Sequence, residues 1–261
     1  KRFFIMNNRF LLYTNDGASD MCLNCIYSLK KVGVADEDIL LYAADENSYE
    51  KLKSHNLNVK LIDGETLDEY QDWNTTGFHR VVHYKIQSII DALKGGSNVF
   101  YLDTDIVAFK NPMEFVTNIP DAESFDIMIQ DDSDSQGRWH SLCTGVVFIR
   151  SNERTLKFYD ECVKLHAKNI ERGKSTGDQA SFNEIYANKN QIEGLKDLKL
   201  AVLPMEWFPN GQAYFDNNMC NDDKYIVHNN YISGMDLKIQ RFKDHEMWYL
   251  DTGDFNEVIR K

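Results

Sequence analysis

Apolar residues recur along this chain in two alternating patterns. Short, strongly apolar runs bounded by polar residues predict strands, and longer stretches in which apolar residues return every three or four positions predict helices. The predicted strands cover residues 9–14, 38–43, 58–62, 98–102, 126–130, 144–150 and 225–227. The predicted helices cover residues 19–32, 48–54, 79–93, 153–172 and 179–187. Strands that alternate with helices indicate βαβ units, so the sequence predicts an α/β fold with a largely parallel sheet.

This pattern continues without a visible domain boundary. No internal repeat, low-complexity tract or Pro/Gly-rich linker interrupts it, and the 261 residues include only four prolines. We therefore predict a single domain over residues 1–261. Because ligands of parallel α/β sheets bind at the carboxyl ends of the strands, the residues that directly follow each predicted strand are the first candidates for function.

Composition and charge exclude several classes of protein. The chain carries 41 acidic and 29 basic residues, a formal net charge of −12, which argues against a protein that binds nucleic acid. Its apolar runs are far shorter than the roughly 20 residues of a transmembrane helix, so we expect no membrane span. If such an acidic chain binds a phosphorylated ligand, a metal ion is the obvious bridge between the two.

The cysteines give information about the compartment. Their number, five, is odd and does not suggest a disulfide framework. Cys22 and Cys25 lie in a stretch with helical apolar spacing, so we interpret them as buried small side chains rather than as a redox or zinc pair. A reducing compartment, and hence a cytoplasmic location, is the expectation. Because the chain begins at Lys1, the alternative is a lumenal fragment whose membrane anchor has been removed.

The strongest candidate for chemistry is the pair Asp103 and Asp105, which follows the apolar strand 98–102 and precedes another apolar stretch. Carboxylates at i and i+2 of an extended chain point to the same side, about 6–7 Å apart along the backbone. Two oxygen ligands at that spacing can hold one hard cation such as Mn²⁺ or Mg²⁺. The same spacing at Asp36 and Asp38 lies before a strand, where we predict a solvated loop.

Two further segments follow predicted strands. Asp131 and Asp132 come directly after strand 126–130 and are expected to line the same cleft. His228 ends the run 225–227 and is followed by Gly234 and Lys238. A neutral imidazole is a suitable third ligand for Mn²⁺, and a lysine can neutralise phosphate oxygens. Taken alone, His228 is more simply explained as a structural residue, but beside two metal-binding carboxylates it is predicted to be a ligand.

Several segments carry a family resemblance. The segment YLDTDIVAFKNP, from Tyr101 to Pro112, resembles the metal-binding strand of GT-A glycosyltransferases. More closely, the chain is similar to the nucleotide-diphospho-sugar transferase family over about residues 9–248. The other matching segments are TND at 14–16, SLKK at 28–31, CTGVVFIR at 143–150, GDQASFN at 177–183, LPMEWFPNG at 203–211 and HNNYISGMDLK at 228–238.

The resemblance implies a GT-A, Rossmann-like fold and a role for each matching residue. Asp103, Asp105 and His228 would hold Mn²⁺ or Mg²⁺ on the diphosphate of a donor. The resemblance places Thr14, Asn15 and Asp16 at the nucleoside of the donor, and Lys238, Arg80 and Lys85 at its phosphates. It places Gly145 with Asp178 and Gln179 at the sugar, and it also implies that Thr104 and Gly234 contact the donor. Arg80 and Lys85 could equally belong to a solvated helix face, and Asp16 could simply cap a helix.

The catalytic residues implied by the resemblance depend on stereochemistry. If the anomeric configuration is retained, Asp178 or Gln179 would face the anomeric carbon. If it is inverted, a carboxylate must act as base to the acceptor hydroxyl, and Asp131, Asp132 or Asp178 could serve. The aromatic residues that could stack on an acceptor sugar, although each is more simply explained as core, are Trp139, Trp207, Phe208, Tyr214 and Phe215.

The chain differs from the related glycogenin-like group in one motif. In the glycogenin-like group the late histidine is followed closely by a glycine and then by Lys-Pro-Trp. Here Gly234 comes six positions after His228, and no Pro-Trp follows Lys238. This favours the nucleotide-diphospho-sugar transferase branch and leaves the role of Lys238 open.

These observations predict a metal-dependent glycosyltransferase that moves a sugar from a nucleoside-diphosphate sugar, most simply a UDP-sugar, to a glycan or glycoconjugate acceptor. One alternative is a sugar-phosphate nucleotidyltransferase, but residues 15–20 after the first strand contain no Lys or Arg for a basic phosphate loop. The other is a non-catalytic module that binds a nucleotide sugar, against which the intact trio Asp103, Asp105 and His228 argues.

Overall fold

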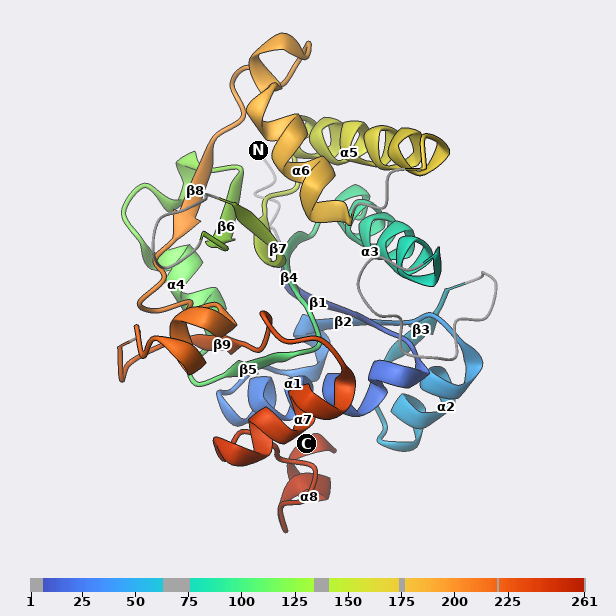
Figure 1. Cartoon of the computed structure of the whole chain (residues 1–261), viewed down its shortest axis with the longest axis vertical. Helices are drawn as coiled ribbons and strands as arrows, with labels where there is room; N and C mark the ends of the chain where they lie inside the picture. Colours follow the sequence, from blue (N-terminus) through green and yellow to red (C-terminus); the bar gives the residue numbers. More distant parts are fainter. Residues whose placement is uncertain (1–6, 63–75, 134–140, 174–176, 220, 261) are drawn as a thin grey trace, which may run out of the picture.

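A seven-stranded sheet forms the centre of the molecule (Figure 1). The computed structural model describes residues 7–62, 76–133, 141–173, 177–219 and 221–260. Within them the sheet order is β3-β2-β1-β4-β7-β6-β8. The strands are β1 Asn8–Thr14, β2 Ile39–Ala43, β3 Val59–Leu61, β4 Asn98–Leu102, β6 Ile127–Asp131, β7 Leu142–Ile149 and β8 Leu200–Leu203. All neighbouring pairs are parallel except those of β7, which is antiparallel to β4 and β6. The predicted mixed, mostly parallel sheet is therefore confirmed.

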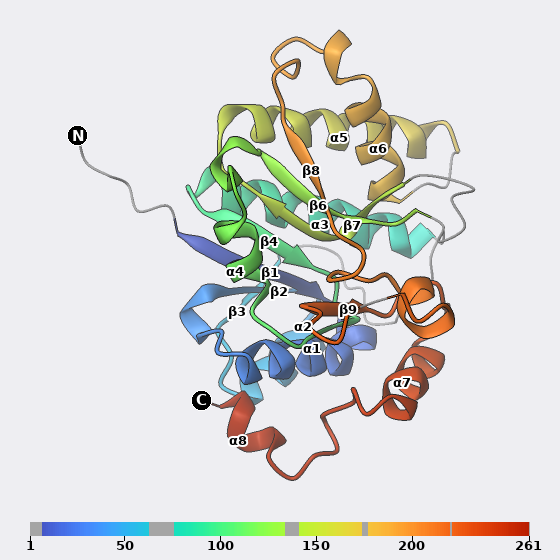
Figure 2. The ribbon, with the colours of Figure 1, turned by 90° about the vertical axis from the view of Figure 1, so that its left-hand side faces the viewer.

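Helices cover both faces of this sheet (Figure 2). The faces differ because successive strand residues point to opposite sides: Phe10 and Leu12 of β1 face one core, and Leu11 and Tyr13 face the other. The helices on the first face are α1 Ser19–Lys31, α2 Glu46–Ser54, α4 Pro112–Asn118 and α8 Phe255–Ile259. The helices on the second face are α3 Thr76–Lys94, α5 Glu153–Glu171 and α6 Asp178–Ala187.

A second, smaller sheet and one more helix complete this side of the fold. β5 (Ile106–Ala108) and β9 (Ile226–His228) pair antiparallel in a small second sheet, and α7 (Met235–Asp244) packs beside them (Figure 1). The sequence predicts β9 as the strand at 225–227, but not β5 or α7. This second sheet matters for function because it sets Ile106 opposite His228. Among the described helices none is both long enough and apolar enough to cross a membrane.

Candidate functional site

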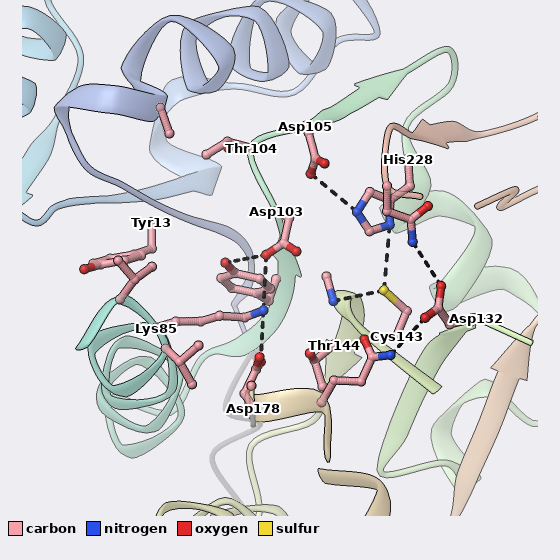
Figure 3. Close-up of a pocket in the computed structure, with 18 of the residues that line it drawn as sticks. Tyr13, Lys85, Asp103, Thr104, Asp105, Asp132, Cys143, Thr144, Asp178 and His228 are labelled. Atoms are coloured by element: carbon pink, nitrogen blue, oxygen red, sulfur yellow. Dashed lines mark hydrogen bonds and ion pairs between the residues drawn. The ribbon is translucent and has the colours of Figure 1, made fainter. Parts of the chain in front are cut away.

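The carboxyl ends of β1, β4 and β9 and the first residues of β7 meet at one cavity of about 1100 Å³. The helix α6 starts at the cavity with Asp178, and α3 contributes Lys85 (Figure 3). This is the edge of the sheet at which parallel α/β folds bind their ligands. The cavity is large enough to hold a nucleotide sugar with room to spare.

Asp103, Asp105 and His228 lie together at this cavity, as the sequence predicts. One ligand atom from each lies within 4.8 Å of the other two. Backbone hydrogen bonds fix this arrangement: Asp103 donates its N–H to the Gly145 carbonyl at 2.7 Å, and Asn229 donates to the Asp105 carbonyl at 2.9 Å. The pairing of β5 with β9 thus places His228 beside the acidic pair, although it lies 123 positions after Asp105 in the sequence.

Two lysines neutralise the acidic pair. Lys238 Nζ lies 2.5 Å from Asp105 Oδ2, and Lys85 Nζ lies 3.1 Å from Asp103 Oδ1. Burial by itself would raise the pKa of Asp105, but the ammonium group of Lys238 opposes it, and the pKa lies well below its usual range. Lys85 also contacts Asp178 Oδ2 at 3.0 Å, so it is shared by two carboxylates. Burial would lower the pKa of Lys85, but Asp103 and Asp178 together raise it.

The donor set fits a hard divalent cation. Two carboxylates and one imidazole offer oxygen and nitrogen ligands, which Mn²⁺ accepts readily. Gly145 supports the same interpretation, because a Cβ at this position would clash with Asp103 Oδ2 and lie 2.7 Å from His228 Cε1. The resemblance places Gly145 at the donor sugar, whereas in the structure its backbone also packs directly against two of the three candidate ligands.

A second polar group, centred on Asp132, lies near His228 and Cys143 (Figure 3). Gln179 Nε2 donates to Asp132 Oδ2 at 2.9 Å, and Asn230 Nδ2 donates to Asp132 Oδ1 at 3.0 Å (Figure 3). Burial raises the pKa of Asp132 although both amides stabilise its ionised form. Two of the residues predicted to be catalytic, Asp132 and Gln179, therefore contact each other, and a third, Asp178, contacts Lys85.

The other predicted residues divide into those at the cavity and those away from it. The predicted residues that also line the cavity are Thr14, Asn15, Thr104, Gly145 and Lys238. Asp16 is not among the lining residues and donates its backbone N–H to Asp45. Asp131 accepts a hydrogen bond from the N–H of Ser133. Gly234 has φ +92°, a conformation that favours glycine, and precedes α7, which carries Lys238.

Arg80 belongs to α3, but its side chain lies outside the described residues, as does Trp139. Trp207 and Phe208 pack on Phe115 in the core, away from the cavity. Tyr214 and Phe215 pack on each other and on His245. For these four aromatic residues the structure supports a packing role.

Cys22 and Cys25 are free and fully buried, and burial raises the pKa of Cys22 to about 12. The prediction of two buried small side chains is confirmed. Asp38 forms an ion pair with Arg9 and Asp36 with Lys30 on a half-exposed turn, which agrees with their prediction as surface residues.

Several residues of the site were not predicted. Tyr101 donates its hydroxyl to Asp103 Oδ1 at 2.9 Å, Gln130 contacts His228 Nδ1 at 2.7 Å, and Tyr231 donates its hydroxyl to the Asp132 carbonyl at 2.8 Å. Asn230 and Tyr231 could have been found, because they directly follow the strand that ends in His228. Tyr101 and Gln130 lie inside strands, where their side chains read as ordinary core positions.

Comparison with known proteins agrees with the geometry. The sequence model of a family described as nucleotide-diphospho-sugar transferase matches residues 34–242. The chain is 26% identical to a UDP-galactose:fucoside alpha-3-galactosyltransferase of Dictyostelium discoideum, over 97% of this chain and 45% of that protein. It is 29% identical to UDP-D-xylose:L-fucose alpha-1,3-D-xylosyltransferase 3 of Arabidopsis thaliana, over 72% of this chain and 52% of that protein. The chain thus spans about half the length of these relatives.

Solved structures share the fold at lower identity. The glycosyltransferase GlyE of Streptococcus pneumoniae superposes with a TM-score of 0.60 at 15% identity, over 97% of this chain and 62% of GlyE. The galactosyltransferase LgtC, in complex with donor and acceptor sugar analogs, superposes with a TM-score of 0.56 at 11% identity, over 96% of this chain and 95% of LgtC. The predicted GT-A fold is therefore confirmed.

Proposed function

The chain belongs to the nucleotide-diphospho-sugar transferase family, and from that premise we propose that it is a metal-dependent glycosyltransferase. The donor is a UDP-sugar, and the acceptor is a carbohydrate hydroxyl on a glycan or glycoconjugate. The observation that carries this proposal is the convergence of Asp103, Asp105 and His228 on one point of a large cavity. The relatives that use UDP-galactose and UDP-D-xylose support the choice of donor nucleotide.

Asp103, Asp105 and His228 would hold Mn²⁺ or Mg²⁺ at the donor diphosphate. When bound, this cation supplies Lewis-acid stabilisation of the charge that develops on the departing UDP. Lys238 carries its ammonium group at the same point and complements the negative phosphates. Thr104 lines the cavity between the two aspartates, and Thr14 and Asn15 line it at the end of β1, where they would contact the nucleoside.

The carboxylates outside the trio would serve the two sugars. Asp178, held by Lys85 at 3.0 Å, would accept hydrogen bonds from hydroxyls of the donor sugar. If the anomeric configuration is inverted, Asp132, oriented by Gln179 and Asn230, would accept the proton of the acceptor hydroxyl as the new glycosidic bond forms. Its raised pKa suits that role, because a stronger base takes up a proton more readily.

Fucose-terminated carbohydrates are the first acceptors to test, since the relatives named above act on a fucoside and on L-fucose. The assay measures UDP release from UDP-galactose and UDP-xylose, with and without Mn²⁺ and an α-L-fucoside. We expect Mn²⁺-dependent release that the fucoside accelerates. We expect Asp105→Asn to lose about a thousandfold of this rate, because removing one charged ligand costs several kcal/mol of transition-state stabilisation.

The matched control is Asp36→Asn, which changes the first residue of another Asp-x-Asp pair, on a half-exposed turn. It should keep full activity. An unchanged rate in Asp105→Asn would contradict the metal site. Pyrophosphate release from UTP and a sugar 1-phosphate would instead indicate a nucleotidyltransferase, and calorimetric binding of UDP without donor consumption would indicate a binding module. The predicted cytoplasmic location stays a prediction.

A further inference from the structure

Gln130 lies behind the candidate metal site and is not among the residues that line the cavity. It is the penultimate residue of β6 and is fully buried. The pairing register of β6 with β7 shifts between Ile129 and Gln130, an irregularity of the kind that turns a side chain toward a functional site. Its amide bridges two segments: Nε2 donates to the carbonyls of Phe208 at 3.0 Å and Pro209 at 3.1 Å, and Oε1 lies 2.7 Å from His228 Nδ1.

The orientation of this amide follows from its partners. Backbone carbonyls can only accept hydrogen bonds, so the NH₂ end of Gln130 must face Phe208 and Pro209. The opposite orientation would set Oε1 against two other acceptors in a fully buried place, which is costly. The oxygen end therefore faces His228 Nδ1, and because this oxygen can only accept, Nδ1 must carry the proton.

Among the described residues, Cys143 is the other neighbour of His228 Nδ1, and it competes only weakly for that proton. Cys143 Sγ lies 3.7 Å from Nδ1, a full 1.0 Å farther than the Gln130 oxygen, and already accepts a hydrogen bond from the N–H of Gly145. A cysteine sulfur is in any case only a weak acceptor. The Nδ1–H group of His228 therefore donates its hydrogen bond to Gln130 Oε1.

The consequence appears at the other ring nitrogen. In a neutral imidazole protonated at Nδ1, the lone pair is on Nε2, which lies 3.4 Å from Asp105 Oδ1. Two acceptors that face each other across this gap are stabilised by a cation shared between them. We propose that Gln130 is a positioning residue that holds His228 in the Nδ1–H form, so that its Nε2 can bind a divalent cation together with Asp103 and Asp105.

The segment 208–211 supports this role because it is fastened to the histidine strand as well. The Pro209 carbonyl accepts from the backbone N–H of His228 at 3.3 Å, in addition to the Gln130 amide. Gly211 donates its N–H to Asn230 Oδ1 at 2.6 Å, and a Cβ on Gly211 would clash with the backbone of Asn230. One short segment therefore fixes both Gln130 and the backbone of His228.

The first test needs neither a metal nor a variant of Gln130. Long-range ¹H–¹⁵N spectra of the metal-free protein at pH 8 report which ring nitrogen of His228 is protonated, with His228→Asn used to assign the signal. We expect protonated Nδ1 and bare Nε2. A proton on Nε2 would overturn the proposal, whatever the stability of any variant.

The second test measures Mn²⁺ affinity by electron paramagnetic resonance, with Mn²⁺ alone as the probe. Gln130→Met keeps the length of the side chain but removes both the acceptor and the donors. We expect an affinity loss of about 10- to 100-fold, the usual effect of removing a partner of a metal-binding histidine, together with a change in the His228 ¹⁵N signals.

The matched control is Asn24→Leu. Asn24 is also fully buried and its amide also bridges backbone groups, those of Met247 and Tyr249, but it does not line the cavity. Both variants should lower the melting temperature, and only Gln130→Met should weaken Mn²⁺ binding. An equal loss in both variants, or none in folded Gln130→Met, would contradict the proposal.

This inference rests on the metal site of the proposed function but not on sugar transfer. A protein that binds Mn²⁺ through His228 in its Nδ1–H form and yet transfers no sugar would refute the transferase and leave the role of Gln130 standing.

Discussion

The carboxylates at the two ends of the central sheet are held by different kinds of donor. At the amino end, Asp126 precedes β6 and receives four hydrogen bonds, from Asn152 Nδ2, from Arg154 Nε and Nη2, and from the backbone N–H of Lys199. At the carboxyl end, Asp103 and Asp105 receive the ammonium groups of Lys85 and Lys238 at the margin of a cavity. Of these carboxylates, Asp103 and Asp105 line the cavity described above, and Asp126 does not.

The difference lies in the kind of donor. Each carboxylate oxygen of Asp126 accepts two hydrogen bonds. The donors include a backbone N–H and a guanidinium that binds both oxygens, and such donors have a fixed geometry. A lysine ammonium sits on a flexible stem and can move from a carboxylate to a phosphate. Buried acidic residues thus indicate a ligand site only where their partners can move and where a cavity adjoins them.

The largest effect is expected when the shared lysine is removed. Lys85→Met leaves Asp103 and Asp178 without their common cation, and breaking a buried ion pair by removing one partner costs about 3 kcal/mol or more. Urea denaturation should show this loss, and Mn²⁺ should restore part of it by supplying positive charge.

The control for this change is Lys110→Met, which breaks the exposed pair with Asp223 and should cost less than about 1 kcal/mol. If the two substitutions cost the same, the carboxyl end of the sheet does not hold its charges as we describe.

The next effect is expected at Gly145, where Gly145→Ala would push on Asp103 and His228. A displacement of about 1 Å in a catalytic group can cost about a hundredfold in rate, so we expect a loss of that size in UDP release and a weaker affinity for Mn²⁺. Gly253→Ala is the control, since a Cβ there meets nothing within 4 Å. Equal activity in both variants would show that the close approach at Gly145 is unimportant.

The smallest effect is expected from a substitution of Asp126, at the amino end of the central sheet. Its hydrogen bonds hold the pKa of Asp126 below its usual range against the opposing effect of burial. Its contribution to stability is therefore fully present above pH ~4, the ordinary carboxyl pKa, and is lost as the pH falls through the lower pKa of the folded state. Asp126→Asn should lower the unfolding free energy by about 1–2 kcal/mol at pH 7 and by progressively less below pH 4.

The transfer rate of Asp126→Asn at pH 7, measured well below its melting temperature, should equal that of the parent. A loss of rate without a loss of stability would mean that the two ends of the sheet are not independent.

The local apolar pattern predicted the two carboxylates of the candidate metal site, and strand pairing over a long sequence distance placed the histidine beside them. Asp103 and Asp105 were identifiable because an apolar strand, Asn98–Leu102, leads directly to them. The place of His228 beside them depends on the pairing of β9, which was predicted as a strand, with β5, whose three residues are too few to show a period. Strand β8 was missed for a related reason, since it is a four-residue edge strand on which Val202 is 49% exposed.

Partners of the site residues were the least predictable. No sequence spacing indicates that Lys85 would bridge Asp103 and Asp178, because that contact joins α3, the end of β4 and the start of α6. Gln130 reads as one more residue of a buried strand, and its importance follows only from the carbonyls of Phe208 and Pro209 on one side and His228 on the other.

The most direct test of the central claim is anomalous diffraction at the manganese absorption edge, from crystals grown with Mn²⁺ and UDP. The account predicts one strong peak within coordinating distance of an oxygen of Asp103, an oxygen of Asp105 and Nε2 of His228, with the diphosphate beside it. UDP seated in the cavity with no peak at these three residues, or a peak bound by other groups, would contradict it.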